Sequence, residues 1–353
     1  MSELTSLILE RIASDGPMSL ADYMALCLMH PEHGYYTGRD PLGEQGDFTT
    51  APEISQMFGE LIGLSLAQNW LDQGAPSRFT LAELGPGRGT LMADILRVGR
   101  QVPGFVEAAE VVLVEMSPVL RARQKEVLAH HDPRWLDQVS DLPDGPLWCV
   151  ANEFFDALPI RQFQRAGRGW CERRVGVRDG ALTLGLAGEA PQEALAHRLE
   201  DTSEGDIVEL CPALPAIMAE IGGRIARHGG AALIVDYGDW GSLGDTFQAL
   251  SGHKAVDPFS MSGQADLTAH VDFEAIARAA PCAHSRLSTQ GVFLERLGIT
   301  QRAQALAKTM SGTQLEQHIA AHRRLTHPDE MGTLFKVLGL MPRDGIVWPG
   351  LAQ

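Results

Sequence analysis

The stretch that decides the fold is LAELGPGRGT, residues Leu81–Thr90. A short apolar run leads to the carboxylate of Glu83, glycine then occupies every second position, and a helical pattern begins at the end of the stretch. Because glycine has no Cβ, the backbone at Gly85, Gly87 and Gly89 can adopt positive φ angles and lie close to a ligand. The stretch therefore predicts a strand, a nucleotide-binding loop and a helix in succession.

The spacing of this loop indicates which nucleotide it suits. A P-loop has a Lys before Ser or Thr after its last glycine, whereas Thr90 follows Gly89 directly. The dinucleotide fingerprint places its third glycine three residues after the second, where a pyrophosphate binds, and here the interval is two residues. The Glu83 carboxylate would repel a pyrophosphate and suits an amine-bearing ligand, such as the amino-acid half of S-adenosylmethionine. Glycine-rich turns after strands are common, so an ordinary turn stays the alternative.

Composition and charge bound the class of protein. The chain has 353 residues, 44% of them hydrophobic, which is enough for one large domain or for a core with appended parts. No apolar run is long enough to span a bilayer, and the acidic N-terminus lacks the basic flank of a targeting sequence, so we expect a cytoplasmic protein without membrane insertion. The net charge of −16 argues against nucleic acid as a partner. It suits a basic protein substrate or an ordinary acidic surface.

Cysteine and histidine spacing predicts no metal site. The five cysteines are scattered along the chain and contain no C-x-x-C pair, which argues against a disulfide framework and a thiolate zinc site. His30 and His33 stand three residues apart, as two ligands on a helix would, but Pro31 and Gly34 favour an irregular segment.

The apolar runs after the glycine loop predict a doubly wound α/β sheet of the Rossmann type. Helical periodicity over 90–99 separates the first strand from a second one over 111–115. Nearly continuous apolar runs over 147–151 and 231–236 are typical of buried parallel strands, with a helix over 213–227 before the last. Ligands of such sheets bind outside the carboxyl ends of the strands, so the polar residues there are the candidates for a site.

Several polar residues stand at or near those ends. The acidic residue that ends the second strand commonly accepts hydrogen bonds from ribose hydroxyls, and Glu115 is the candidate, with an exposed strand-end carboxylate as the alternative. Asn152 ends a later strand and is expected to face the site. Glu153 and Asp156, among phenylalanines, can hold a cationic group while the rings exclude water, unless the rings simply fill the core. Asp47 precedes the glycine loop by one helix and can close over a ligand or remain a solvated turn residue.

Helical segments precede this core. Apolar residues at helical spacing predict helices over 4–13 and 20–29, interrupted by a Gly-Pro pair. Thr50 followed by Glu53 fits a capping box at the start of a helix that runs from about residue 54 to residue 70.

A hairpin and a helical region complete the chain. Strand-like stretches over 162–177 and 181–186, joined across Arg178-Asp179-Gly180, predict a hairpin inserted in the sheet. The segment over 293–340 is mostly helical by pattern.

Five motifs occur in order along the chain: GDFTTAPEIS at 46–55, ELGPGRGT at 83–90, NEFFDALP at 152–159, DYG at 236–238 and ADLT at 265–268. Together they resemble the MidA family of class I S-adenosylmethionine-dependent methyltransferases, from about residue 23 to residue 341. That family includes the mitochondrial complex I assembly-factor protein arginine methyltransferase. The acidic N-terminus without a presequence suggests a bacterial member.

The resemblance implies symmetric dimethylation of an arginine on the 49-kDa-type subunit of respiratory complex I, or on its bacterial counterpart, early in assembly. Glu83 and the glycine-loop backbone would hold the methionine moiety of S-adenosylmethionine, Glu115 would hold the ribose, and Asn152 would also contact the cofactor. Glu153 would be the bidentate carboxylate that orients and polarises the guanidinium. Asp156 and Asp47 are secondary candidates for that role.

The resemblance also implies an organisation in three parts. A helical N-terminal arm would cover 1–45, a class I methyltransferase core 46–292 with a hairpin inserted at about 160–190, and a helical extension packed on the core 293–353. Bacterial members would be cytoplasmic, eukaryotic relatives would lie in the mitochondrial matrix, and a homodimer is an open assembly state. Two other functions stay open: a non-catalytic complex I assembly chaperone that keeps the fold, and a methyltransferase acting on a small molecule.

Overall fold

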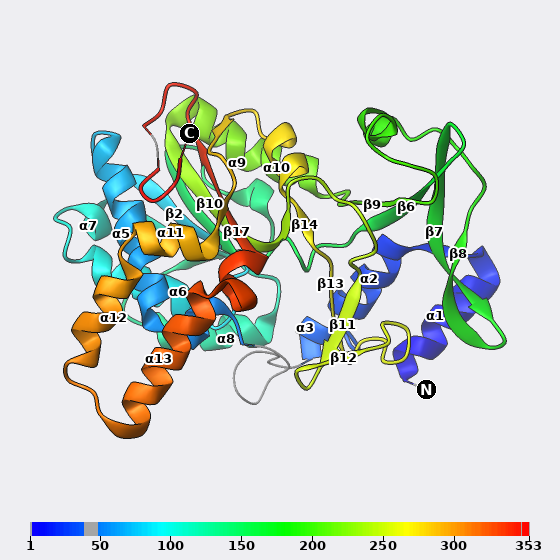
Figure 1. Cartoon of the computed structure of the whole chain (residues 1–353), viewed down its shortest axis with the longest axis horizontal. Coiled ribbons are helices and arrows are strands. Elements are labelled where there is room, and N and C mark those ends of the chain that lie inside the picture. The colour runs from blue at the N-terminus through cyan, green and yellow to red at the C-terminus, as the bar shows by residue number, and fades with distance from the viewer. Residues whose placement is uncertain (1, 39–48, 347, 353) are drawn as a thin grey trace. The chain divides into compact units, whose positions relative to one another are not determined.

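The computed structural model describes residues 2–38, 49–346 and 348–352. The chain divides into two compact units, each of which collects several separate segments (Figure 1). We call one of them the core unit; it consists of Thr49–Phe155, Pro215–Gly238 and Phe273–Gln353. The other is the accessory unit; it consists of Met1–Phe48, Asp156–Leu214 and Asp239–Asp272.

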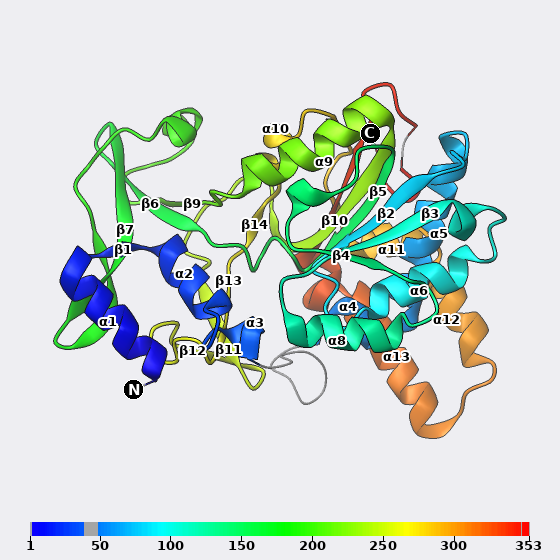
Figure 2. The same ribbon diagram turned by 180° about the vertical axis from the view of Figure 1, so that it is seen from behind.

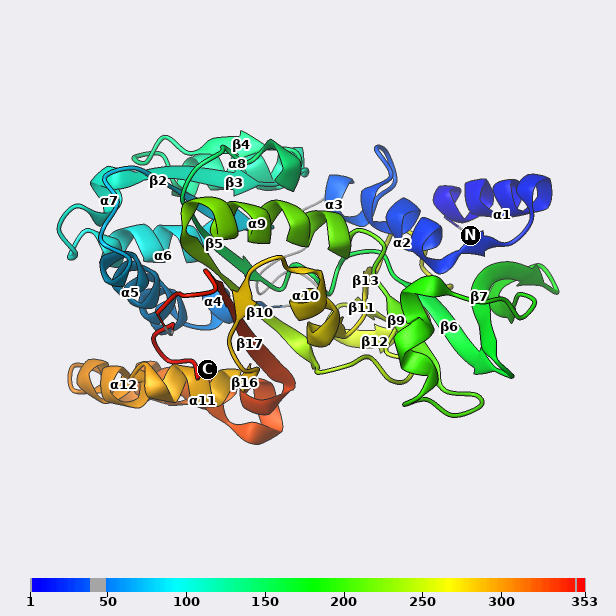
Figure 3. The ribbon, with the colours of Figure 1, turned by 90° about the horizontal axis from the view of Figure 1, so that it is seen from above.

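The core unit is built around a mostly parallel sheet. Strand β2 (Phe79–Leu84) pairs in parallel with β3 (Ala109–Val114) on one side and with β5 (Leu147–Asn152) on the other. Strand β10 (Gly230–Asp239) continues in parallel beside β5, and β17 (Phe335–Met341) pairs with β10 in antiparallel fashion. Figure 3 shows these strands in the order β17, β10, β5, β2, β3. The predicted doubly wound sheet is confirmed.

Helices cover both faces of this sheet. Those that pack together on the face seen in Figure 1 are α5 (Gln56–Asp72), α6 (Thr90–Gly99), α11 (Gln290–Arg296), α12 (Ile299–Ala307) and α13 (Gly312–Thr326). Helix α9 (Leu214–His228) crosses the opposite face, seen in Figure 2. Alternate strand residues, such as Leu81, Trp148 and Leu233, are buried in one hydrophobic core with α5 and α6.

Shorter elements complete the core unit. They are α4 (Ala51–Ile54), α7 (Phe105–Ala108), α8 (Pro118–Val127), β4 (Arg134–Leu136), a 3₁₀ turn over Val139–Asp141, α10 (Phe273–Ala279), β15 (Ala283–His284), β16 (Ser288–Thr289) and a π-helical turn over Pro328–Gly332.

Two glycines explain why α5 and α6 lie so close together beside the glycine loop. A Cβ at Gly59 would be 2.5 Å from the Cβ of Asp94, and one at Gly63 would be 2.8 Å from the Cα of Ile95. Neither position has room for a side chain. Helix α6, which begins directly after the glycine loop, is therefore held tightly against α5.

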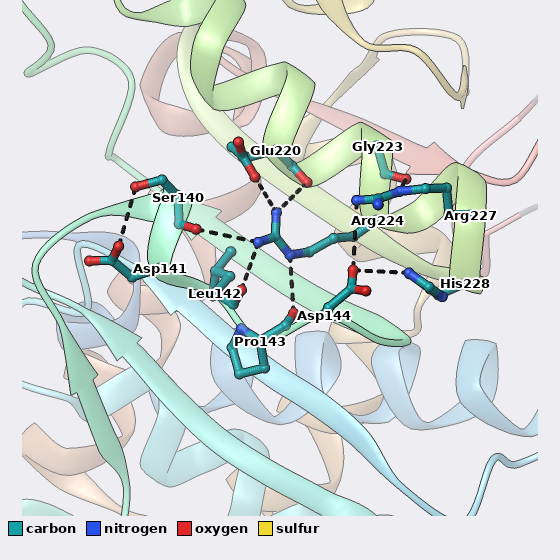
Figure 4. Close-up of polar contacts among 10 residues, drawn as sticks. All are labelled: Ser140, Asp141, Leu142, Pro143, Asp144, Glu220, Gly223, Arg224, Arg227 and His228. Atoms are coloured by element: carbon teal, nitrogen blue, oxygen red, sulfur yellow. Dashed lines mark hydrogen bonds and ion pairs between the residues drawn. The ribbon is translucent and has the colours of Figure 1, made fainter.

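A buried arginine fixes the connection that leads into β5. Arg224 on α9 donates from Nε to the carbonyl of Pro143 at 3.0 Å and from Nη2 to the carbonyl of Leu142 at 2.6 Å (Figure 4). Its Nη1 atom lies 2.5 Å from Oε2 of Glu220, which balances the charge. Carbonyl groups outside regular structure need donors when they are buried, so Arg224 stabilises the approach to a strand that carries candidate site residues.

The accessory unit holds two smaller sheets. A five-stranded sheet has the order β1 (Met18–Ser19), β7 (Gly169–Arg178), β6 (Arg161–Ala166), β9 (Ile207–Leu210), with β8 (Ala181–Leu186) paired to β7. A three-stranded sheet has the order β12 (Lys254–Val256), β11 (Gln248–Ser251), β13 (Asp266–Thr268). Apolar residues of the N-terminal helices, including Leu4, Ile8 and Tyr23, share a core with Val175 of β7.

The bounds of the accessory elements are α1 (Glu3–Asp15), β1 (Met18–Ser19), α2 (Leu20–Met29), α3 (Tyr35–Gly38), β6 (Arg161–Ala166), β7 (Gly169–Arg178), β8 (Ala181–Leu186), a 3₁₀ segment over Glu193–Leu199, β9 (Ile207–Leu210), β11 (Gln248–Ser251), β12 (Lys254–Val256), β13 (Asp266–Thr268) and β14 (Val271–Asp272).

The structure confirms the two N-terminal helices and the hairpin turn, in which Asp179 and Gly180 both have positive φ. It corrects three details. The hairpin belongs to a sheet of its own, because its strands pair with β1 and β6 rather than with the central sheet. The predicted capping box does not form, since the Thr50 side chain makes no capping bond and Ser55 caps α5 instead. The helical pattern fails over β17, an apolar run that pairs with β10.

The division into arm, core and C-terminal extension stays a prediction. In the part of the chain that the structure describes, no helix combines the length and the apolar character needed to cross a membrane.

Candidate active site

The glycine loop has the backbone geometry that its sequence predicts. Gly85, Gly87 and Gly89 have φ angles of 60°, 53° and 85°. A Cβ at Gly85 would lie 2.9 Å from Cδ2 of Phe154, so a side chain would have to displace the ring. Gly89 is the N-cap of α6, and the first N–H groups of that helix therefore open onto the loop. The loop offers bare backbone and helix donors to a ligand.

Glu83 is a buried carboxylate with one oxygen atom that accepts no hydrogen bond from the described residues. It is 3% exposed near the end of β2, and its Oε2 atom has no hydrogen-bond partner among the described residues. Burial raises the pKa of Glu83 to about 8, the backbone N–H of Met92 opposes this shift, and the charge of Glu115 adds to it. A bound ammonium group would supply the missing partner. Glu83 therefore fits the amine end of S-adenosylmethionine.

Glu115 follows β3 directly and is held by several donors. Its Oε1 atom accepts from the N–H of Ser117 at 2.8 Å, and its Oε2 atom accepts from Nε2 of Gln124 at 3.2 Å. Burial raises the pKa of Glu115, and those two donors and the charge of Arg121 act in the opposite direction. The guanidinium of Arg121 also donates to the carbonyl of Glu115 and pairs with Asp137 at 2.6 Å. The carboxylate is thus fixed in place at a strand end.

Asn152 is the last residue of β5, which pairs with β2, and Glu153 follows it directly. Glu153 has a φ of 52°, a strained value for a residue with a side chain, and its N–H donates to the carbonyl of Val235 at 2.9 Å. Its Oε1 atom accepts from the N–H of Ala51 at 3.0 Å and from Nδ2 of Asn152 at 3.1 Å. Oδ1 of Asn152 is buried, and no described residue donates to it. Glu153 therefore also has a structural task, because it anchors the start of α4.

Two further contacts organise the same strand ends, and sequence reasoning assigned them no role. Asp236 on β10 is fully buried and accepts from the N–H groups of Phe154 and Phe155 at 3.2 and 2.9 Å, so it shapes the turn after Glu153. Oγ1 of Thr90 donates to Glu53 at 2.5 Å and joins α4 to the first turn of α6. The signal for Asp236 was a carboxylate at a strand end, which is equally typical of a ligand site.

Gln124 is the other residue that the sequence pattern did not single out. It lies on α8 with no solvent exposure, and it bonds both Glu115 and the carbonyl of Gly87. Leu120 and Leu128, four residues to either side, are buried as well. A glutamine on the apolar face of a helix was the available signal, because a buried amide needs partners.

The predicted residues thus fall into three groups. The core unit brings together the strand-end and loop residues, namely Glu83, Gly85, Gly87, Gly89, Glu115, Asn152 and Glu153. Asp156 belongs to the accessory unit, where its carbonyl accepts from the N–H of Ala269 at 3.0 Å. Asp47 lies outside the described residues. Across 2–38, 49–346 and 348–352, no group of three His, Cys, Asp or Glu side chains could hold a metal ion.

The surroundings of Asp156 contain a second buried carboxylate. Tyr36 donates from its hydroxyl to Oδ1 of Asp266 at 2.9 Å, and both aspartates are less than a tenth exposed. Burial raises the pKa of Tyr36 well above its ordinary value, and the charges of Asp266 and Asp156 raise it further. Two motif residues far apart in the sequence, Asp156 and Asp266, therefore lie near the same tyrosine.

Comparison with known proteins shows the family of the chain. Residues 61–292 match the family described as "Putative S-adenosyl-L-methionine-dependent methyltransferase". The mouse protein arginine methyltransferase NDUFAF7, mitochondrial, is 38% identical over 95% of this chain and 83% of its own length, and the human protein of the same name is 37% identical over 95% and 82%. A crystal structure from Burkholderia thailandensis, bound to S-adenosyl-homocysteine, has 31% identity and a TM-score of 0.84, over 98% of this chain and 94% of its own.

The core unit contains a buried carboxylate whose Oε2 atom has no partner among the described residues, a glycine loop with three positive φ angles and a second carboxylate after the next strand. These features are compatible with such a cofactor. The chain belongs to this family and is an S-adenosyl-L-methionine-dependent methyltransferase.

Proposed function

We propose that the enzyme methylates an arginine side chain of a protein. The observation that carries this proposal is its similarity over nearly its whole length to relatives named protein arginine methyltransferase. We further propose symmetric dimethylation of the 49-kDa-type subunit of respiratory complex I, or of its bacterial counterpart in the cytoplasm, during assembly. The name shared by these relatives and the motifs of the sequence support this narrower target.

The core unit would hold the cofactor through residues already in place. Glu83 would pair with the amine, and the glycine loop would lie against the methionine moiety. Glu115 would accept hydrogen bonds from the ribose hydroxyls, and Asn152 would accept a hydrogen bond at its buried Oδ1 atom. When bound, S-adenosylmethionine supplies an electrophilic methyl group. These residues fix its position without touching the atom that moves, and position alone can account for much of the rate.

The acceptor needs a carboxylate because arginine is always protonated in proteins. We propose that Glu153 orients the guanidinium, with Asp156 and Asp47 as secondary candidates for the same task. Glu153 is suited to precise orientation, since its backbone and its Oε1 atom are fixed by Val235, Ala51 and Asn152.

One experiment separates this function from the two alternatives. The full-length protein is incubated with S-adenosylmethionine carrying a labelled methyl group and with an extract depleted of small molecules, and the label is located by mass spectrometry. Label on one arginine of a complex I subunit is the expected result, and Gly87→Val serves as the control without cofactor. If label appears only on metabolites, once the small molecules are returned to the extract, the protein is a small-molecule methyltransferase. No label, with S-adenosyl-homocysteine still bound, would show an assembly chaperone.

A further inference from the structure

Gln124 makes contact with both parts of the candidate cofactor site. It lies in the middle of α8 and has no solvent exposure. Its Nε2 atom is 2.7 Å from the carbonyl oxygen of Gly87 and 3.2 Å from Oε2 of Glu115. Its Oε1 atom is 2.8 Å from Nε1 of Trp135, on β4. One side chain therefore touches the glycine loop, the carboxylate after β3 and the neighbouring strand.

The orientation of this amide is determined by its partners. An indole N–H can only donate, so the oxygen of Gln124 must face Trp135. Both hydrogens on Nε2 then face the two acceptors, Gly87 and Glu115. Every hydrogen-bonding atom of the side chain is used, and neither acceptor could be served if the amide were turned over. The network permits one arrangement.

Fixing the Gly87 carbonyl has a consequence for the loop. In a trans peptide the C=O and the following N–H point in opposite directions. The bond from Gln124 thus also fixes the direction of the Arg88 N–H, in a loop whose glycines allow more backbone conformations than other residues would.

We propose that Gln124 is a positioning residue for the cofactor, which holds the Glu115 carboxylate and the Gly87 peptide in the one arrangement that binds S-adenosylmethionine. This inference rests on the cofactor roles proposed above for Glu115 and the glycine loop. Gln124 itself touches neither the cofactor nor the acceptor in this account.

The charges around Glu115 make the proposal testable by pH. Arg121 on α8 favours the ionised carboxylate and Glu83 on β2 opposes it, while Asp137 pairs with Arg121. The amide of Gln124 donates to the carboxylate and so lowers the pKa of Glu115 against the effect of burial. Loss of that donor should make Glu115 easier to protonate, whereas a carboxylate in its place should repel Glu115 until one of the two takes up a proton.

The test measures the Kd of S-adenosyl-homocysteine by calorimetry from pH 6 to 8.5 with the full chain. Each variant is expressed as a ratio to the wild-type Kd at the same pH, which cancels the titration of Glu83. Gln124→Leu removes one donor from the buried Glu115 carboxylate and one from the partly buried Gly87 carbonyl, and it should weaken binding about tenfold to a hundredfold at pH 8. Its ratio should grow as the pH falls, while the ratio of Gln124→Glu should be large at pH 8.5 and shrink as the pH falls.

Two further variants guard against a simple folding defect. Trp135→Phe keeps the ring and removes the N–H, so it should weaken binding about threefold to tenfold by releasing the amide orientation. Gln290→Leu is the matched control, because Gln290 is another fully buried glutamine of the core unit, whose Nε2 donates to the Leu325 carbonyl at 2.9 Å. Its ratio should stay near one at every pH.

Opposite slopes for Gln124→Leu and Gln124→Glu would support the proposal, because a merely structural residue would shift both ratios alike. The proposal would be overturned if the Kd ratios of the Gln124 variants did not change with pH. It would also be overturned if Trp135→Phe and Gln124→Glu both bound the ligand as tightly as the wild type does. None of these readouts involves methyl transfer. If arginine is not the acceptor, the proposed function fails while the Gln124 result stands.

Discussion

The replacement Glu83→Gln should raise the relative stability of the cofactor-free protein at high pH and lower its affinity for the cofactor. The ordinary pKa of a glutamate is 4.5, and burial with the charge of Glu115 raises that of Glu83 to about 8. The folded protein therefore holds one proton that the unfolded chain releases between these values. Because the folded pKa is the higher one, this contribution favours folding at low pH and is lost as the pH rises from about 4.5 through about 8.

The size of the effect follows from the shift. The raised pKa of Glu83 opposes folding by roughly 3 kcal/mol at pH 7, where the folded protein retains a proton that the unfolded chain has released. The cost reaches roughly 5 kcal/mol above pH 9, where Glu83 is ionised in both states, at about 1.4 kcal/mol per pKa unit. Glutamine keeps the acceptor for the Met92 N–H but cannot ionise. Its amide brings a separate penalty for an unpaired buried donor, of about 1–3 kcal/mol, which does not change with pH. The ionisation of Glu83 should therefore show in how the difference in unfolding free energy between the two proteins changes with pH.

The assay is urea unfolding of both proteins at pH 5.5, 6.5, 7.5 and 8.5, without cofactor and then with saturating S-adenosyl-homocysteine. Relative to Glu83→Gln, the wild type should lose roughly 1.4 kcal/mol per pH unit up to about pH 8. With ligand bound, the ammonium group should ionise Glu83 and flatten that slope, and Glu83→Gln should bind about tenfold to a hundredfold more weakly at pH 8. Parallel stability curves for the two proteins, or equal affinities, would refute the pairing of Glu83 with the amine.

The remaining predictions address the loop, the acceptor side and the scaffold. Gly87→Val should abolish S-adenosyl-homocysteine binding, because a β-branched residue is strained at a φ of 53°, and normal calorimetric titration would overturn the loop assignment. Glu153→Gln keeps an acceptor for the Ala51 N–H, so cofactor affinity should stay within a fewfold while methyl transfer falls at least a hundredfold; loss of cofactor binding would contradict the acceptor role. Glu60→Ala should destabilise the protein by about 3 kcal/mol in urea unfolding, because this buried carboxylate pairs with the partly exposed Arg97 and Arg302 at 2.9 and 2.8 Å. The Kd of S-adenosyl-homocysteine should not change, and an altered Kd would show that this ion-pair network affects the site.

The elements that carry the proposed cofactor residues could be predicted because their signals are local. The strand, loop and helix from Phe79 to Gly99 are specified by an apolar run, three glycines and a helical period, and the structure reproduces each of them. Glu115 could be identified as a candidate for the same reason, since it follows the next apolar run directly. Asp236 stood in an equivalent position in the sequence, and in the structure its carboxylate accepts hydrogen bonds from three backbone N–H groups. Position alone could not separate those two carboxylates.

The two N-terminal helices and the hairpin of the accessory unit were predicted, but the way its segments assemble was not, because long-range pairing brings them together. Strand β7 pairs with Met18 and Ser19, about 155 residues away, and β13 pairs with β11 rather than with the central sheet. Strand β17 was missed for a different reason. Its apolar run FKVLGLM has no helical or alternating period of its own, and only the free edge of β10 makes it a strand.

Glu83 and Glu115, whose pKa values are both raised, repel each other when both are ionised, and this should couple cofactor binding to proton release. Glu83 and Glu115 are both buried, and the charge of one disfavours ionisation of the other. Donors from Ser117 and Gln124 compensate Glu115 within the protein, whereas the Oε2 atom of Glu83 has no partner among the described residues. Binding a ligand with an ammonium group should therefore ionise Glu83 and release a proton near neutral pH. A ligand that keeps the ribose but lacks the amine, such as methylthioadenosine, should bind without that release, which calorimetry in buffers of different ionisation enthalpy can measure.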